Sequence, residues 1–305
     1  MTIPGVTRVP ILFVNAYLVA SGEDFVLVDT GVRGAGTAAI LRAIARRYGR
    51  HARPTAIILT HGHFDHAGSA HTLARRWDVP VYAHRLELPY LTGRSSYPPQ
   101  DPTVGGTLAN LSRAFPRAAI DLGTDVHPLA EGGEIPDLAG WCAMHTPGHT
   151  PGHISLFRED DGALIAGDAI ATMDQESPVE LFVRRRQLRW PPATMTPDWQ
   201  SARRTVEALA RLRPDAVAAG HGLPITGSGV ADALEQFART FTPPPHGRYV
   251  HQAARADERG TLELPPPVPD PVGRVLKGVA AAVAVASVVR AARRRRRRRR
   301  DRHAA

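Results

Sequence analysis

Apolar residues follow two different periodicities that alternate along most of the chain. Residues 56–60 form a short apolar, β-branched run, which predicts a buried strand. Residues 37–48 repeat their apolar side chains at helical spacing with arginines between them, which predicts an amphipathic helix. By the same criteria we expect strands at 9–20, 25–28, 79–83, 141–144, 154–157, 163–166 and 216–219, and helices at 69–77, 107–115 and 199–212. This alternation of strands and helices favours an α/β fold.

The C-terminal part of the chain has a different composition. Proline clusters at 243–245 and 265–271 predict extended segments. The apolar stretch 279–289 is shorter than the roughly 20 residues needed to span a bilayer. We therefore expect a folded domain large enough to be an enzyme over residues 1–242, a Pro-rich extension over 243–272, and a disordered tail over 273–305.

The positive charge of the protein is confined to that tail. The formal net charge is +9, from 38 Lys and Arg residues against 29 Asp and Glu residues. Residues 290–305 contain ten arginines and one aspartate, so they carry the whole excess and the rest of the chain is neutral. The arginines either bind anionic lipid or nucleic acid weakly, or have no function. Binding to lipid would place the protein at a membrane surface. No specific nucleic-acid partner is predicted.

A single cysteine, Cys142, restricts both the chemistry and the expected compartment. One cysteine excludes an intramolecular disulfide and a Cys-rich zinc module, and it fits a reducing cytoplasm, which is the location we expect. We expect no export signal in the apolar run at 9–20, because Pro10 and Asn15 interrupt it. The sequence gives no indication of the oligomeric state.

Four metal-binding side chains directly follow the strand predicted at 56–60: His61, His63, Asp65 and His66. Imidazole and carboxylate together suit Zn²⁺ first, with Fe, Mn and Ni as alternatives. Because alternate residues diverge from one another, this motif can serve two adjacent ions. Asp29 follows the strand predicted at 25–28, where it either orients a ligand histidine or caps a turn.

Three further strands also end in metal-binding residues. The loop 145–153 repeats Thr-Pro-Gly around His149, and it holds two other histidines, His145 and His153. Asp168 follows the strand predicted at 163–166, and His221 follows the one at 216–219. Since functional groups in α/β proteins gather at the carboxyl ends of strands, we expect these side chains to share one site with the first motif.

The four motifs resemble those of the metallo-β-lactamase-fold superfamily in order and spacing: His-Gly-His-Phe-Asp-His at 61–66, Thr-Pro-Gly-His-Thr at 146–150, Gly-Asp at 167–168 and Gly-His-Gly at 220–222. The resemblance covers about residues 6–240 and implies an α/β fold, namely a four-layer αβ/βα sandwich with a dinuclear site at one sheet edge. It implies two Zn²⁺ per chain, with Fe or Mn as alternatives. The implied ligands are His61, His63 and His149 for one metal, Asp65, His66 and His221 for the other, and Asp168 as the bridge, with Asp29 as a supporting aspartate.

Departures from individual subfamilies narrow the implied activity. The best-known dizinc β-lactamases use a cysteine where this chain has Asp168, whereas a bridging aspartate resembles glyoxalase II, acyl-homoserine lactonases and related hydrolases. The resemblance implies that a metal-bridging hydroxide cleaves a small ester, thioester or lactone, with Asp65 and Asp168 as catalytic residues that orient the water or take its proton. A phosphodiesterase of the same fold, a mononuclear iron enzyme similar to persulfide dioxygenases, and a nucleic-acid-binding protein that uses its arginine tail are the alternatives.

Residues 173–197 separate Asp168 from the next predicted helix and are both basic and aromatic. We expect this segment to form a lid over the site. Its candidate substrate-binding residues are Phe182, Arg184, Arg186 and Trp190, which suit an anionic or acyl-bearing small molecule. The alternative is a solvated loop whose arginines face water.

Overall fold

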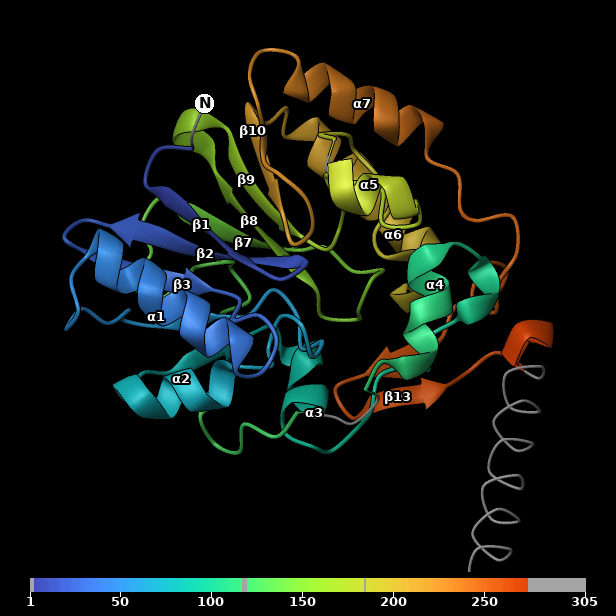
Figure 1. Cartoon of the computed structure of the whole chain (residues 1–305), viewed down its shortest axis with the longest axis horizontal. Coiled ribbons are helices and arrows are strands. Elements are labelled where there is room, and N and C mark those ends of the chain that lie inside the picture. Colours follow the sequence, from blue (N-terminus) through green and yellow to red (C-terminus); the bar gives the residue numbers. More distant parts are fainter. Residues whose placement is uncertain (1–2, 117–119, 184, 274–305) are drawn as a thin grey trace, which may run out of the picture. The chain divides into compact units, whose positions relative to one another are not determined.

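The computed structural model describes residues 3–116, 120–183 and 185–273, without the side chains of residues 181–182 (Figure 1). The chain divides into two compact units, residues 1–266 and 267–305. The arginine run and the apolar stretch 279–289 lie outside the described residues. Within the described residues, no helix has both the length and the hydropathy required to cross a membrane.

The first sheet has six strands in sequence order: β1 (Val6–Ile11), β2 (Val14–Ser21), β3 (Asp24–Val28), β4 (Ile57–Ile58), β5 (Val81–Ala83) and β6 (Val126–Pro128). The first three strands are antiparallel, and β3 to β6 are parallel. The single strand predicted at 9–20 is therefore wrong. The chain reverses at Leu12, whose φ of 54° is left-handed, so that Ile11 pairs with Val14.

The second sheet has five strands in the order β11 (Ile225–Thr226), β10 (Ala216–Ala219), β9 (Ala163–Gly167), β8 (Ile154–Arg158) and β7 (Trp141–His145). Only β9 and β10 are parallel. Because their carboxyl ends point the same way, the residues that follow them, at 168 and 220–221, emerge at one edge of this sheet.

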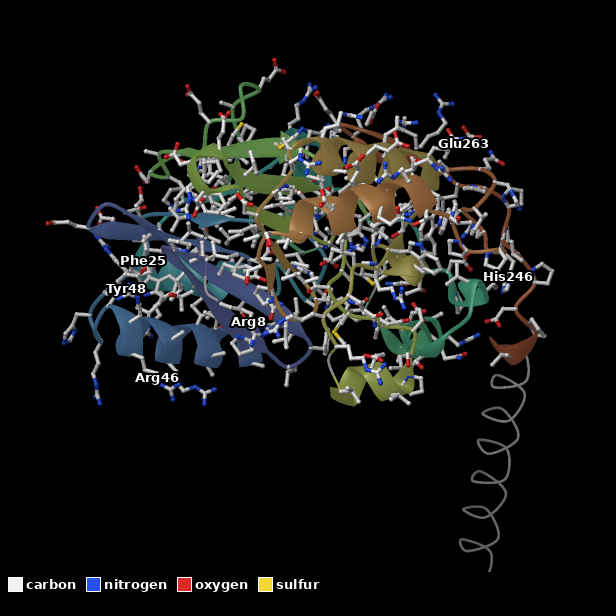
Figure 2. All side chains as sticks on the ribbon, turned by 90° about the horizontal axis from the view of Figure 1, so that it is seen from above. Arg8, Phe25, Arg46, Tyr48, His246 and Glu263 are labelled. Carbon is white, nitrogen blue, oxygen red and sulfur yellow. The ribbon has the colours of Figure 1, made fainter. Side chains whose placement is uncertain are left out.

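Helices cover the outer faces of both sheets (Figure 1). Those of the first sheet are α1 (Ala35–Arg47) and α2 (Ala70–Trp77), and those of the second are α6 (Trp199–Arg211) and α7 (Val230–Thr240). Phe25 of β3 stacks on Tyr48, which follows α1, with ring centroids 4.0 Å apart (Figure 2). The helix ends predicted from sequence for α1, α2 and α6 agree with these bounds to within two residues, whereas α7 was not predicted.

Three buried clusters fill the spaces between the four layers. Strand β3 shows how they form, because Leu27 packs in the cluster under α1 and α2 while its neighbour Val26 packs between the sheets. Strand β9 does the same, with Ile165 between the sheets and Leu164 in the cluster under α6 and α7. Sheets that bury both faces explain why these runs are continuously apolar. The predicted four-layer αβ/βα sandwich is confirmed.

Shorter elements surround one end of the sandwich: α3 (Leu88–Leu91), α4 (Thr107–Leu111) and α5 (Pro178–Val183), with 3-10 turns at 85–87, 102–104, 112–114 and 193–195. A further 3-10 turn at 159–161 joins β8 to β9 at the opposite end. The helix predicted at 107–115 is thus a short α-helix followed by a 3-10 turn. Residues 243–266 lie within the first unit and contain a hairpin, β12 (Arg255–Asp257) and β13 (Gly260–Glu263). Thr261 of this hairpin bonds to Ser95 and Ser96 in the segment after α3.

Candidate metal centre

Seven predicted metal-binding residues meet at the edge where the two sheets open. They come from loops that follow β4, β7, β9 and β10: His61, His63, Asp65, His66, His149, Asp168 and His221. All seven are buried. Backbone bonds hold the two sheets together beside them, because Ile154 donates to Thr60 and Asn15 donates to Gly220. Loops that follow four different strands therefore supply one compact group of donors.

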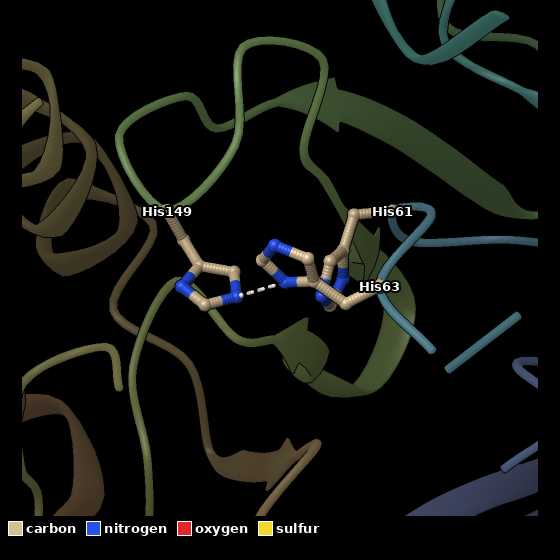
Figure 3. A group of neighbouring side chains, drawn as sticks. All are labelled: His61, His63 and His149. Carbon is tan, nitrogen blue, oxygen red and sulfur yellow. Dashed lines mark hydrogen bonds between the residues drawn. The ribbon is translucent and has the colours of Figure 1, made fainter. Parts of the chain in front are cut away.

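His61, His63 and His149 form the first part of this group (Figure 3). One imidazole nitrogen from each lies within 4.8 Å of the other two. Nδ1 of His63 is 2.9 Å from Nε2 of His149. The hydroxyl of Thr60 donates to Asp29, so Nδ1 of His61, 3.1 Å away, donates to that hydroxyl and leaves Nε2 with a free lone pair.

Asp65, His66 and His221 form the second part, and their ligand atoms also lie within 4.8 Å of one another. Nδ1 of His221 donates to the carbonyl of Phe13 at 2.9 Å, so Nε2 is the nitrogen that faces the group. Between the two parts lies the Asp168 carboxylate. Its Oδ1 is 3.4 Å from Nε2 of His66, and its Oδ2 is 3.5 Å from Nε2 of His149 and 3.2 Å from Nε2 of His221.

Burial controls the protonation of the first three imidazoles. It lowers the pKa of His63 to about 3 and holds the pKa values of His61 and His149 well below the ordinary range, so all three are neutral at pH 7. Burial also lowers the pKa of His66, but Asp168 and Asp29 outweigh it and raise that pKa well above its usual value. The pKa of Asp168 is raised by burial, yet His221 and His66 hold it well below the ordinary range. The site thus combines three neutral imidazoles with a carboxylate that attracts positive charge.

Several buried atoms that could bind a metal have no hydrogen bond among the described residues. They are Nε2 of His61, Nε2 of His66 and Oδ1 of Asp168, although the last two face each other at 3.4 Å. Such atoms are costly unless something else satisfies them. Imidazole and carboxylate are common ligands of divalent metals, and each group of three has its donor atoms close together. The residues present therefore fit divalent cations.

Asp29 supports this cluster from behind. Its Oδ2 lies 2.8 Å from Nδ1 of His66, and both of its oxygens accept bonds from Thr60. The backbone of Asp29 is left-handed, with φ 58°, a conformation that aspartate tolerates better than most residues. A carboxylate on the far nitrogen of a histidine fixes the ring and directs its other nitrogen at the cluster.

Glu87 connects the two main ligand loops, and the sequence analysis missed it. Its side chain is fully buried. One oxygen accepts from Gly62 N at 2.9 Å and from the Tyr97 hydroxyl. The other accepts from Thr150 Oγ1 at 2.7 Å and Gly152 N at 2.8 Å. Since Gly62 lies between two candidate ligands and Thr150 follows a third, Glu87 sets the distance between their loops.

Asn15 plays a similar part for the loop of His221. Its side-chain amide donates to the carbonyls of Ala219 and Gly222 at 3.0 and 2.8 Å. The signal for this residue was a polar side chain inside the apolar run 9–20. Gly220 in the same loop has to lack a side chain, because a Cβ there would collide with the Asp168 carboxylate and the His66 ring.

Two nearby histidines stay outside the donor groups. His153 is buried, and its Nε2 accepts from the backbone N–H of Asp168 at 2.9 Å while Nδ1 faces Thr146. His145 is exposed and stacks on His84, with ring centroids 4.1 Å apart. Cys142 is exposed on β7.

A cavity of about 280 Å³ opens beside the donor group, and Asp65, Asp168 and His221 form part of its wall. The rest of the wall is mostly apolar and comes from the β1–β2 turn, α4 and the segments before and after α5. Its other lining residues are Arg8, Pro10, Leu12, Phe13, Val14, Asn15, Leu108, Leu111, Phe115, Met173, Gln175, Pro192, Met195, Gly222 and Leu223.

The residues predicted to bind substrate lie elsewhere or are not described. Arg184 lies outside the described residues, as does the side chain of Phe182. Arg186 is exposed and donates to the carbonyl of Pro224. Trp190 is half-buried and packs edge-on against Trp199. Neither lines the cavity, and the role of all four in substrate binding stays a prediction.

Comparisons with known proteins agree with the motif analysis. The model of the metallo-beta-lactamase superfamily matches residues 9–221. The chain is 42% identical over 243 residues to the probable metallo-hydrolase YflN of Bacillus subtilis, covering 78% of this chain and 91% of that one. Among solved structures it is similar to TTHA1623 in a di-iron-bound form, with 30% identity, a TM-score of 0.51, and coverage of 77% of this chain and 97% of that one. TTHA1429 of Thermus thermophilus shares the fold, with 24% identity, a TM-score of 0.54, and coverage of 78% and 79%.

Proposed function

Because the chain belongs to the metallo-beta-lactamase superfamily, we propose that it is a metal-dependent hydrolase acting on a small ester, thioester or lactone. The observation that carries this proposal is the pair of buried donor groups on either side of Asp168, next to a cavity large enough for a small molecule. The relative YflN, which is named a probable metallo-hydrolase and is matched over 91% of its length, supports the proposal. A cavity lined mainly by apolar side chains favours an acyl group over a phosphodiester.

We assign His61, His63 and His149 to one cation, Asp65, His66 and His221 to a second, and Asp168 to both. Zn²⁺ is the cation that this donor set suits best, and iron is the alternative because a similar structure contains two irons. When bound, the cations would polarise the substrate carbonyl and lower the pKa of a water molecule to about 7.

The chain's own residues have three tasks in this proposal. Asp29, Glu87 and Asn15 hold the donors in place through the bonds described above. Asp65 and Asp168, which line the cavity, orient the attacking water and take its proton. The apolar wall takes up the acyl part of the substrate and keeps bulk water away from the carbonyl.

Metal analysis combined with a substrate panel tests the proposal. The purified protein is loaded with zinc or iron and assayed on thioesters, lactones and phosphodiesters, with oxygen uptake recorded in parallel. We expect two metals per chain and hydrolysis of at least one ester, thioester or lactone. One iron per chain with oxygen consumption would instead indicate a dioxygenase.

The Asp168→Ala variant tests the bridging role in the same assay. A shared carboxylate reduces the repulsion between two neighbouring cations. We therefore expect the variant to retain one metal and lose the other. Loss of both metals, or of neither, contradicts the assignment.

A further inference from the structure

Gln175 is a buried polar residue that the proposed reaction does not use. Only 8% of its surface is exposed. Both atoms of its carboxamide, Oε1 and Nε2, are buried, and neither has a hydrogen-bond partner in the part of the chain that the structure describes. Gln175 lines the cavity beside the candidate metal centre. A buried carboxamide without hydrogen bonds to either atom destabilises the folded protein. A hydrogen-bonding partner that enters the cavity would offset this cost.

Neighbouring contacts fix the position of Gln175. Asp174 pairs with Arg189 at 3.2 Å. Glu176 accepts bonds from the backbone N–H groups of Leu108 and Ala109, at 3.1 and 3.4 Å, at the start of α4. Because both flanking residues are tied to other segments, Gln175 is held in the cavity wall before any ligand arrives. A preorganised group loses little entropy when it binds.

The surroundings of Gln175 define the chemistry of its partner. The wall around it is mostly apolar, with Met173, Leu108 and Phe115 among the lining residues. Asn15, also in the wall, already uses its amide to hold the loop of His221, and its carbonyl oxygen accepts from Arg8 at 2.9 Å. A carboxamide offers one acceptor and a donor group, so its best partner is an uncharged group that offers both in return. A secondary amide is such a group.

We propose that Gln175 is a specificity-determining residue that binds an amide group within an otherwise apolar substrate, while the substrate's ester carbonyl faces Asp65, Asp168 and His221. The inference rests on the proposed function for the ester. The recognition of the amide is independent of catalysis. The group that Gln175 binds is uncharged. A charged group would lose its hydration on entering the apolar wall, and the neutral carboxamide of Gln175 offers no opposite charge to compensate.

Binding of two matched probes to the metal-loaded protein tests this recognition without any reaction. The first probe is N-propylhexanamide, and the second is the ketone in which CH₂ replaces the amide N–H. Isothermal titration calorimetry measures both with the unmodified protein, Gln175→Met and Gln236→Met. Methionine preserves the length of glutamine and removes its hydrogen bonds. Gln236 is exposed on α7, outside the cavity lining, and serves as the control for the same exchange.

We expect the unmodified protein and Gln236→Met to bind the amide about tenfold more tightly than the ketone, and Gln175→Met to bind both equally. The proposal is overturned if the unmodified protein does not prefer the amide, if neither probe binds, or if Gln175→Met keeps the preference. The last result would mean that water alone satisfies the carboxamide.

Hydrolysis of two matched esters separates this inference from the proposed function. The ethyl esters of N-hexanoylglycine and of nonanoic acid have chains of equal length, and only the first contains an amide. We expect kcat/KM to favour the first in the unmodified protein, and Gln175→Met to lose that advantage while still cleaving the second. If neither ester is cleaved, the proposed ester hydrolysis fails, and the binding preference still decides the role of Gln175.

Discussion

The sheet edge that carries the seven candidate metal ligands, here called the edge, and the wall of the adjoining cavity are built in different ways. The donors His61 to His221 sit on short loops directly after strands, they are buried, and partners such as Asp29 and Glu87 hold them. The cavity wall comes from the β1–β2 turn, α4 and residues 173–195, and parts of it, such as Leu12 and Leu111, are largely exposed. A rigid edge suits a reaction that needs fixed geometry, whereas a wall of turns can change without disturbing the edge.

This difference separates two kinds of defect. A change at the edge should remove metal and lower kcat, because the reaction depends on the donors. A change in the wall should alter KM and substrate preference and leave the metal content intact. The predictions below test that separation.

The largest effect is expected for His149→Ala. Removing one imidazole from the first donor group leaves too few ligands to hold a cation, so activity should fall to background and the metal content should drop. The melting temperature of the metal-free protein should change little, since the residue lies on a loop between β7 and β8. His145→Ala in the same loop is the control and should keep its activity. Turnover near that of the unmodified protein in His149→Ala would rule out the ligand assignment.

Glu87→Gln should have the next largest effect, although Glu87 is not a proposed ligand. The oxygen of glutamine can accept from only one of Gly62 and Gly152, and its amide nitrogen faces the N–H of the other, so the two ligand loops lose their common anchor. We expect metal affinity to fall about 10- to 100-fold, measured by competition with a chelator. Glu258→Gln, an exposed residue that pairs with Arg85, should leave the affinity unchanged. Equal metal affinity in both variants would show that Glu87 does not position the ligand loops.

A smaller and different effect is expected for Leu111→Ser in the cavity wall. Leu111 is 54% exposed, so folding should tolerate the change. Loss of apolar contact with the substrate should raise KM about threefold, with kcat and metal content unchanged. A fall in metal content would show that the wall and the edge are not separate.

The smallest effect concerns Glu176, which joins α4 to the segment that carries Gln175. Burial raises the pKa of Glu176 to about 7. The folded protein therefore holds the proton more tightly than the unfolded chain does. The resulting stability is complete below the unfolded pKa of about 4.5 and is lost as the pH rises through about 7. Urea midpoints measured across this range should fall less with pH in Glu176→Gln, and parallel curves would contradict the assignment.

The edge was predictable from sequence because its signals are local. Four donors within 61–66 directly follow an apolar run, and Asp168 and His221 repeat the arrangement after later strands. Local signals of this kind also located most strands and helices. The exact pairing of β1 and β2 was not visible, because Leu12 is an unusual residue for a left-handed turn.

Glu87 and the cavity wall were not predictable for the opposite reason. Glu87 stands between two leucines and looks like an ordinary surface acid, and its burial depends on N–H groups 25 and 65 residues away. The wall combines segments from 8 to 223 that are far apart in the sequence, and its mostly apolar residues form no local motif. The basic and aromatic residues of segment 173–197 were predicted to bind substrate. The described residues of this segment that line the wall are instead Met173, Gln175, Pro192 and Met195.

The donors of each proposed ion come from both sheets, and this links metal supply to the lifetime of the protein. His61 and His63 follow β4 of the first sheet, whereas His149 lies between two strands of the second. A cation held between them keeps the sheets docked, so its binding adds to the free energy of unfolding, by about 4 kcal/mol when free metal exceeds the dissociation constant 1,000-fold. Proteases act on chains that open, and a cell short of metal would therefore degrade this protein faster as well as lose its activity.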